Sequence, residues 1–271
     1  MALSGLAARA ERRELRAPRL GGMLPVPRAW LRARPRMQGL LVAVNGARHQ
    51  LPHRRGGLHV LLYHDVAPEF EPNLAAHLDA LQDRGRFMQW PEGLAAITGA
   101  APLEVPTFSL TFDDGHKEWV GGVLTLLQER NITATFFVTT NKVVGGRSRT
   151  SLTWADCAEL LAAGMLIGSH SVTHRRLTLL ADAEAREEIF LSKQELEQRL
   201  GIDVQDFSIP YGLPGHDFGE RELALIAEAG YRSSVTALPG RNGAGQSPYE
   251  VRRCGLHPAW PLSAVGQRVH E

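Results

Sequence analysis

The chain has 271 residues, of which 44% are hydrophobic, so it is long enough and apolar enough to bury a core of its own. It carries 30 Lys and Arg against 29 Asp and Glu, which gives a formal net charge of +1. This balance excludes the strong overall field by which a basic protein attracts nucleic acid, so we expect no nucleic-acid partner.

The N-terminal region differs in composition from the rest of the chain. Residues 1–55 contain twelve arginines and only two glutamates, and four prolines lie within residues 1–36. Because proline interrupts helices, we expect residues 1–56 to form an Arg-rich extension that is partly disordered or helical, with a short amphipathic helix over 37–48. Such a basic arm would allow peripheral contact with an anionic membrane surface. Residues 57–271 are predicted to form the folded domain.

The sequence shows no run of 18 apolar residues and no apolar segment of the length that a secretory signal needs. We therefore expect a protein of the cytoplasm or of the inner face of the membrane. Cys157 and Cys254 are too few for a disulfide framework and lack the CxxC spacing of a zinc or redox site. We interpret both as packing residues, with a single disulfide left open. The sequence does not indicate an oligomeric state.

From residue 58 onward, short apolar runs alternate with helical patterns, which is typical of βα units and a parallel sheet. A closed barrel leaves no exposed strand edges, so we predict a distorted (β/α)7-type barrel of mainly parallel strands. The predicted strands are 58–63, 87–90, 107–112, 133–138, 165–169, 204–209 and 231–235. The predicted helices are 72–84, a turn from Pro91, 117–129, 153–163 with a capping-box spacing at its start, 181–200 and 219–229.

Polar groups follow four of these predicted strands, at the point where each strand ends. They are residues 64–65, 113–114, 170–174 and 210–212. In a parallel α/β barrel, functional side chains gather where strands end and the following loops begin. We therefore expect these four segments to meet at one mouth of the barrel.

The residue types at this mouth suggest a metal site. His170 and His174 are four residues apart, and with Asp114 they make two imidazoles and one carboxylate, a set suited to zinc or another divalent transition metal. Neighbouring strand residues point to opposite sides, so we expect Asp114 to hold the metal while Asp113 moves a proton. The same donors can hold ferrous iron for oxygen activation, which leaves an oxygenase as an alternative.

Three ordered motifs resemble those of a known family. They are Thr111–Gly115 (TFDDG), His170–His174 (HSVTH) and Phe207–Gly212 (FSIPYG). They resemble the polysaccharide deacetylase family, also called the NodB-homology or carbohydrate esterase 4 family, over residues 58 to 257. The early Tyr63–His64 pair resembles the motif of one subgroup of this family, whose members carry Tyr-His near the start of the domain. The resemblance implies a metal-dependent hydrolase that removes N-acetyl or similar small acyl groups from an amino sugar of a polysaccharide or glycoconjugate.

The resemblance also implies a role for each motif residue. Asp114, His170 and His174 would bind the metal, Asp113 would be the general base, and the backbone N–H of Tyr211 would stabilise the oxyanion. A general acid must still protonate the leaving amine. The candidates are His64 and His257, and we favour His64 because it directly follows the first predicted strand.

Two positions depart from the family pattern. Ser208 stands where many relatives carry an arginine that orients the base, so we expect Asp113 to lack that partner. The late segment ending at His257 is out of register by one residue with the usual acid motif. These departures leave a catalytically weak or inactive glycan-binding relative as a further alternative.

Overall fold

The computed structural model describes residues 56–99, 102–143 and 149–270. The predicted Arg-rich extension, its helix over 37–48 and its membrane contact lie outside the described residues. The boundary predicted at residue 57 stays a prediction. No helix of the described part of the chain is long and apolar enough to cross a membrane.

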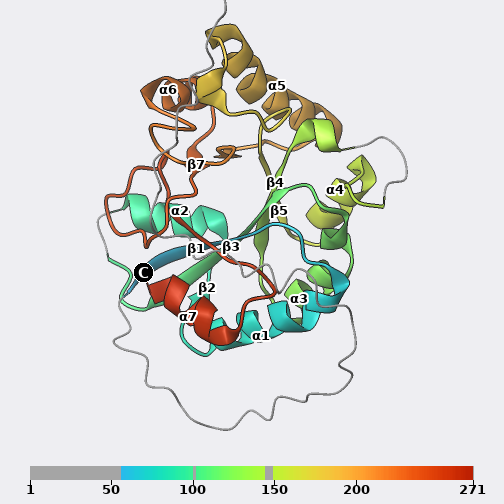
Figure 1. Cartoon of the computed structure of the whole chain (residues 1–271), viewed down its shortest axis with the longest axis vertical. Helices are drawn as coiled ribbons and strands as arrows, with labels where there is room; N and C mark the ends of the chain where they lie inside the picture. The colour runs from blue at the N-terminus through green and yellow to red at the C-terminus, as the bar shows by residue number, and fades with distance from the viewer. Residues whose placement is uncertain (1–55, 100–101, 144–148, 271) are drawn as a thin grey trace, which may run out of the picture. The chain divides into compact units, whose positions relative to one another are not determined.

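Eight strands form one sheet in the described part of the chain, and every pairing between them is parallel (Figure 1). Their order is β7-β6-β5-β4-β3-β1-β8, with β2 paired to β3 off this path. The strands are β1 (Gly57–Tyr63), β2 (Arg86–Phe87), β3 (Pro106–Asp114), β4 (Ala134–Val138), β5 (Leu166–Ser169), β6 (Asp206–Ser208), β7 (Ser233–Val235) and β8 (Arg253–Gly255).

The two edge strands, β7 and β8, are brought together by the segment that precedes β8. Val235 forms an isolated parallel bridge with Val251, and the Thr236 N–H donates to the Val251 carbonyl at 2.8 Å. The Arg253 N–H donates to the Leu238 carbonyl, also at 2.8 Å. The sheet therefore closes almost completely on itself, and the predicted parallel barrel is confirmed.

Helices surround this sheet, and helical structure is found in every region where a helix was predicted. They are α1 (Glu71–Gln82), α2 (Trp90–Thr98), α3 (Gly122–Glu129), α4 (Trp154–Ala162), α5 (Asp182–Leu200), α6 (Glu220–Glu228) and α7 (Leu262–His270). Short 3-10 turns are η2 (Pro68–Phe70), η3 (Lys117–Val120), η4 (Thr140–Lys142) and η5 (Leu177–Leu179).

The structure differs from the sequence prediction in several places. The strand predicted over 87–90 is limited to Arg86–Phe87, and Trp90 already begins α2. The single helix predicted over 117–129 is broken into η3 and α3, because Gly121 adopts φ −124° and ψ −118°, a conformation outside the helical region. The prediction also missed β8 and α7. β8 is only three residues long and carries an arginine and a glycine, so no apolar run marks it in the sequence.

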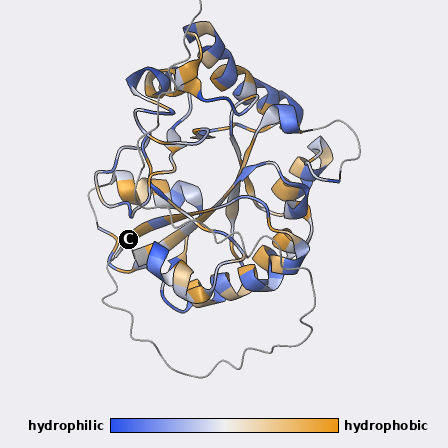
Figure 2. Ribbon diagram, in the orientation of Figure 1, coloured by the Kyte–Doolittle hydropathy of each residue, from blue (hydrophilic) through white to orange (hydrophobic). Residues whose placement is uncertain are grey.

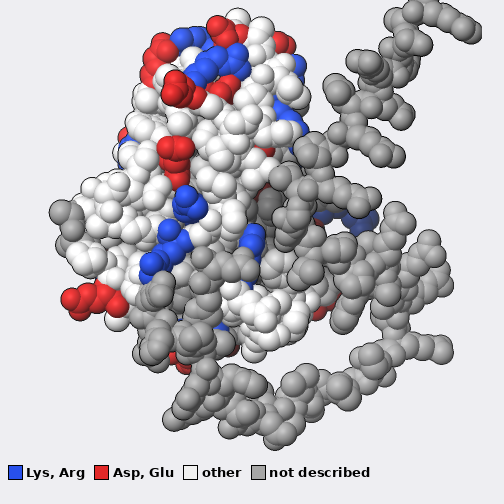
Figure 3. Space-filling view, turned by 60° about the vertical axis from the view of Figure 1, so that its left-hand side comes forward, with Lys and Arg blue, Asp and Glu red and all other residues white. Residues whose placement is uncertain are grey.

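Buried apolar residues of the helices and the strands form one large core cluster. Figure 2 shows hydrophobic residues, in orange, on both kinds of element. Cys157 and Cys254 are both buried, as expected of packing residues. Around α5 and α6, at the top of Figure 3, positive and negative side chains are interspersed. The ion pair of Arg186 with Glu228 joins these two helices. The charges on these two helices thus agree with the balanced charge of the sequence.

The capping box predicted at the start of α4 is formed. The Asp156 N–H donates to Thr153 Oγ1 at 3.2 Å, and the Thr153 N–H donates to Asp156 Oδ2 at 2.8 Å. Thr153→Ala should therefore lower the free energy of unfolding by about 1 kcal/mol, whereas Thr153→Ser should not. Urea denaturation of the three proteins measures this difference, and equal midpoints for the alanine and serine variants would contradict it.

Candidate active site

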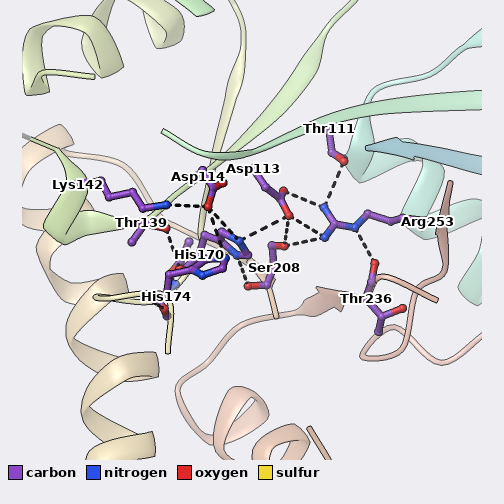
Figure 4. Close-up of polar contacts among 12 residues, drawn as sticks. Thr111, Asp113, Asp114, Thr139, Lys142, His170, His174, Ser208, Thr236 and Arg253 are labelled. Carbon is purple, nitrogen blue, oxygen red and sulfur yellow. Dashed lines mark hydrogen bonds and ion pairs between the residues drawn. The ribbon is translucent and has the colours of Figure 1, made fainter. Parts of the chain in front are cut away.

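Asp114, His170 and His174 come together at the ends of β3 and β5 (Figure 4). One ligand atom from each lies within 4.8 Å of the others. Asp114 Oδ1 is 3.5 Å from His174 Nε2 and 3.9 Å from His170 Nε2. The three residues predicted to bind a metal are thus neighbours in space, although 55 residues of chain lie between Asp114 and His170.

The hydrogen bonds of His170 prepare its ring for a metal. Its Nδ1 lies 2.7 Å from the Ser208 carbonyl oxygen, which can only accept, so Nδ1 carries the proton. Burial lowers the pKa of His170 to about 4, which outweighs the opposing effect of Asp113, so the ring is neutral at physiological pH. Nε2 then carries a lone pair that can bind a metal, 3.9 Å from Asp114 Oδ1.

Asp114 is ionised, as a carboxylate that binds a metal must be. Burial would raise its pKa, but contacts with His116 and Lys142 lower it well below the ordinary range. The Lys142 ammonium lies 2.9 Å from Asp114 Oδ1. One carboxylate oxygen and two imidazole nitrogens in reach of one another are the donors that zinc takes in catalytic sites, so these residues fit a divalent metal.

Backbone strain is concentrated at this site. Five non-glycine residues of the described part of the chain have positive φ, and four of them belong to the predicted motifs. They are Asp114 (95°), Ser171 (63°), His174 (62°) and Tyr211 (62°). Such conformations cost about 1–3 kcal/mol each and persist where the surrounding structure imposes them.

The strain at Asp114 changes how the two carboxylates point. His170 Nε2 lies 3.7 Å from Asp113 Oδ2 and 3.9 Å from Asp114 Oδ1, so both carboxylates face the same imidazole. The prediction that they point to opposite sides is wrong, because the φ of 95° at Asp114 ends the alternation of the strand. What distinguishes the two carboxylates is therefore their partners.

Asp113 is held by an arginine that the sequence analysis missed. Arg253, on β8, donates from Nη1 to Asp113 Oδ1 at 2.8 Å and from Nη2 to Oδ2 at 2.7 Å. Both side chains are only 2% exposed. Ser208 Oγ donates to Asp113 Oδ2 at 2.8 Å and accepts from Arg253 Nη2 at 2.9 Å. The expectation that Asp113 lacks an arginine partner is wrong: Arg253 reaches it from another strand.

This arrangement keeps Asp113 ionised. Burial alone would raise its pKa, but the charges of Arg253, His170 and His64 and the hydrogen bonds from Arg253 lower the pKa to about 2. The carboxylate is therefore a proton acceptor across the whole physiological range. Two parallel hydrogen bonds from one guanidinium also fix the plane of the carboxylate.

His64 and His257 lie in different surroundings. His64 follows β1, its side chain is exposed, and it lies near enough to Asp113 for its charge to lower the pKa of that carboxyl group. His257 is also exposed, accepts from the Ala259 N–H through Nδ1, and packs its ring against Phe70. His64 therefore interacts electrostatically with the predicted base, and its role as the acid stays a prediction.

Tyr211 is held in its left-handed conformation from several sides. Its ring contacts His174, with centroids 4.8 Å apart, and the Arg176 guanidinium lies 4.7 Å from the ring centroid. The next residue must be glycine, because a Cβ on Gly212 would lie 2.5 Å from the Ala237 nitrogen. The buried Asp217 accepts from the Leu213 N–H at 2.9 Å and fixes the loop that follows.

Arg253, Arg176 and Asp217 were not found from the sequence. The signal for Arg253 is weak, since it amounts to one of two adjacent arginines between the apolar residues Val251 and Cys254. Arg176 and Asp217 lie two and five residues beyond recognised motifs, and nothing in their spacing shows that they meet. Only the folded chain brings them to the site.

The fold and the cluster at its strand ends define an α/β barrel with a two-histidine, one-carboxylate site. Residues 100–234 match the family model described as Polysaccharide deacetylase, and the chain belongs to this family. The solved deacetylase PplD of Streptococcus pyogenes, in complex with acetate, is 22% identical with a TM-score of 0.68, covering 79% of this chain and 98% of that chain. IcaB of Ammonifex degensii is 24% identical with a TM-score of 0.69, covering 80% and 99%. At these identities the two structures show a shared fold.

Two named proteins are similar in sequence over shorter stretches. A bifunctional xylanase/deacetylase of Pseudobutyrivibrio xylanivorans is 30% identical over 103 residues, which are 38% of this chain and 16% of that protein. Chitin deacetylase 1 of Cryptococcus neoformans is 29% identical over 123 residues, which are 45% of this chain and 24% of that protein. The matches thus span less than a quarter of each relative.

The ion pair between Arg253 and Asp113 should contribute measurably to the free energy of unfolding. Arg253→Met leaves a buried carboxylate without its partner, which should lower the free energy of unfolding by about 3–5 kcal/mol. Arg253→Lys keeps the charge but not the two-point geometry, so its loss should be smaller. Guanidinium denaturation compares them, and equal losses in the two variants would contradict the role of the charge.

The low pKa of Asp113 should also make stability depend on pH. Because the folded-state pKa of about 2 lies below the ordinary 3.8, the stabilisation is complete above pH 3.8 and is lost as the pH falls toward 2. A shift of this size corresponds to about 2 kcal/mol. Unfolding of the metal-free protein between pH 4 and 2 should show this loss, and Asp113→Asn should show a correspondingly shallower dependence.

Proposed function

We propose that this protein is a metal-dependent hydrolase that removes N-acetyl, or a similarly small acyl group, from an amino sugar of a polysaccharide or glycoconjugate. The observation that carries the proposal is the cluster of Asp114, His170 and His174, with a second carboxylate, Asp113, fixed beside it by Arg253. Membership of the polysaccharide deacetylase family supports the reaction class. The similar proteins named as a xylanase/deacetylase and a chitin deacetylase support a carbohydrate substrate.

Asp114, His170 and His174 would hold the metal, and zinc is the ion that this donor set suits best. When bound, the metal would polarise the amide carbonyl and lower the pKa of a water molecule. Asp113 would take the proton from the attacking water, since it is ionised and cannot rotate away from the site. Arg253 contributes by holding both oxygens of Asp113 in place.

Two further steps, stabilisation of the oxyanion and protonation of the leaving amine, would be carried out by residues on either side of the cluster. The backbone N–H of Tyr211 would stabilise the oxyanion formed when water adds to the amide carbon. The left-handed backbone at Tyr211, supported by Arg176 and Gly212, holds that N–H in one direction. His64, exposed at the end of β1, would donate a proton to the sugar nitrogen as the carbon–nitrogen bond breaks.

Acetate release from a panel of N-acetylated sugars and oligosaccharides, with defined metals, tests this proposal. Asp113→Asn should lower turnover by about 10²-fold or more while the metal stays bound, because only the base is removed. His174→Ala should lose the metal, because one of its three ligands is gone. Asp83→Asn, an exposed carboxylate at the end of α1, is the control and should match the wild type.

Each alternative predicts a different result in the same experiment. An oxygenase would need dioxygen and release no acetate, whereas the hydrolase should be equally active without oxygen. A glycan-binding relative would retain the oligosaccharide without cleaving it. Full acetate release by either Asp113→Asn or His174→Ala would overturn the proposed roles of these residues.

A further inference from the structure

Helix α5 presents two buried polar side chains to the loop that carries both histidines. Glu188 and Ser192 are four residues apart, so they lie on the same face of the helix. Glu188 is 6% exposed and Ser192 is fully buried. A carboxylate at such a position is costly unless it is hydrogen-bonded, so its partners indicate why it is there.

Both carboxylate oxygens of Glu188 accept hydrogen bonds from Thr173, in the loop between His170 and His174. The Thr173 N–H donates to Glu188 Oε2 at 2.8 Å, and Thr173 Oγ1 donates to Oε1. One turn further along α5, Ser192 Oγ lies 2.7 Å from Ser169 Oγ. The helix therefore binds the loop at both ends, next to His170 and next to His174.

The loop needs such support because its backbone is strained. Ser171 and His174 both have φ near +60°, which is unfavourable for residues with a side chain. Within the loop, the His174 N–H donates to Ser171 Oγ at 3.0 Å. Thr173 lies between these two strained positions, and its contacts with Glu188 tie that stretch of backbone to a rigid helix.

We propose that Glu188 is a positioning residue that sets the metal affinity of the site, by fixing Thr173 and thereby the imidazole of His174. The inference rests on the metal site of the proposed function and assigns a role to a residue outside the three motifs. Groups that hydrogen-bond to metal ligands and orient them typically contribute about 10–100-fold to the metal affinity. Glu188 acts through the residue before the ligand, so we expect about a tenfold effect, at the lower end of that range.

The test is the zinc dissociation constant of the full-length chain, measured by competition with a chromogenic chelator. Glu188→Ala should bind zinc about tenfold more weakly than the wild type. Glu187→Ala, an exposed neighbour on the same helix, should bind like the wild type. Glu188→Gln should be close to the wild type, because its amide can accept from the Thr173 N–H and donate to the Thr173 hydroxyl.

A second pair of variants addresses the same contact from the loop. Thr173→Val removes the hydroxyl that Glu188 accepts from and should weaken zinc binding, whereas Thr173→Ser keeps it and should not. Thr173 is exposed, so these variants decide the question if Glu188→Ala does not fold. Melting of the metal-free variants shows whether the change is confined to metal binding.

Two results would overturn the inference. One is an unchanged zinc affinity in Glu188→Ala or, where that variant does not fold, in Thr173→Val. The other is an equal loss of affinity in Glu187→Ala. A fall in the melting temperature of metal-free Glu188→Ala without a change in zinc affinity would likewise show a purely structural role. These results leave the proposed function intact, whereas a wild-type protein that binds no divalent metal would overturn both.

Discussion

The buried ion pair between Asp113 and Arg253 is the constraint on which the site depends. It joins β3 to β8, the two strands that flank β1 in the sheet. Removing one partner would leave an uncompensated buried charge, which is among the costlier defects in a protein interior. The Arg253 Nε–H also donates to the carbonyl of Thr236, directly after β7, at 2.7 Å. One arginine therefore orients the base and connects the two edge strands of the sheet.

The same logic extends to the loops around the metal ligands. Asp114, Ser171, His174 and Tyr211 all have backbone conformations that a free chain would avoid. Each is held by contacts from elsewhere in the fold, such as Arg176 against the Tyr211 ring and Glu188 against Thr173. The barrel and its helices thus supply the stabilisation that these strained loops lack on their own.

Much of the fold could be predicted from the sequence because its signals are local. The apolar runs of β1 and β3, the capping box at Thr153 and the glycine that ends α5 each depend on a few adjacent residues. β8 could not be predicted, because three residues with one arginine and one glycine form a strand only when neighbouring strands supply their hydrogen bonds. Missing β8 meant missing Arg253, and with it the partner of Asp113.

The sequence by itself determined the parallel barrel, the family and the residues that bear metal-binding chemistry, since motif order and residue type are readable in one dimension. Only the tertiary structure decided that Asp113 and Asp114 face the same histidine, that Arg253 holds Asp113 from another strand, and that Glu188 supports the histidine loop. These are contacts between segments 15 to 140 residues apart. Their geometry follows from packing and closure of the sheet, which no local pattern encodes.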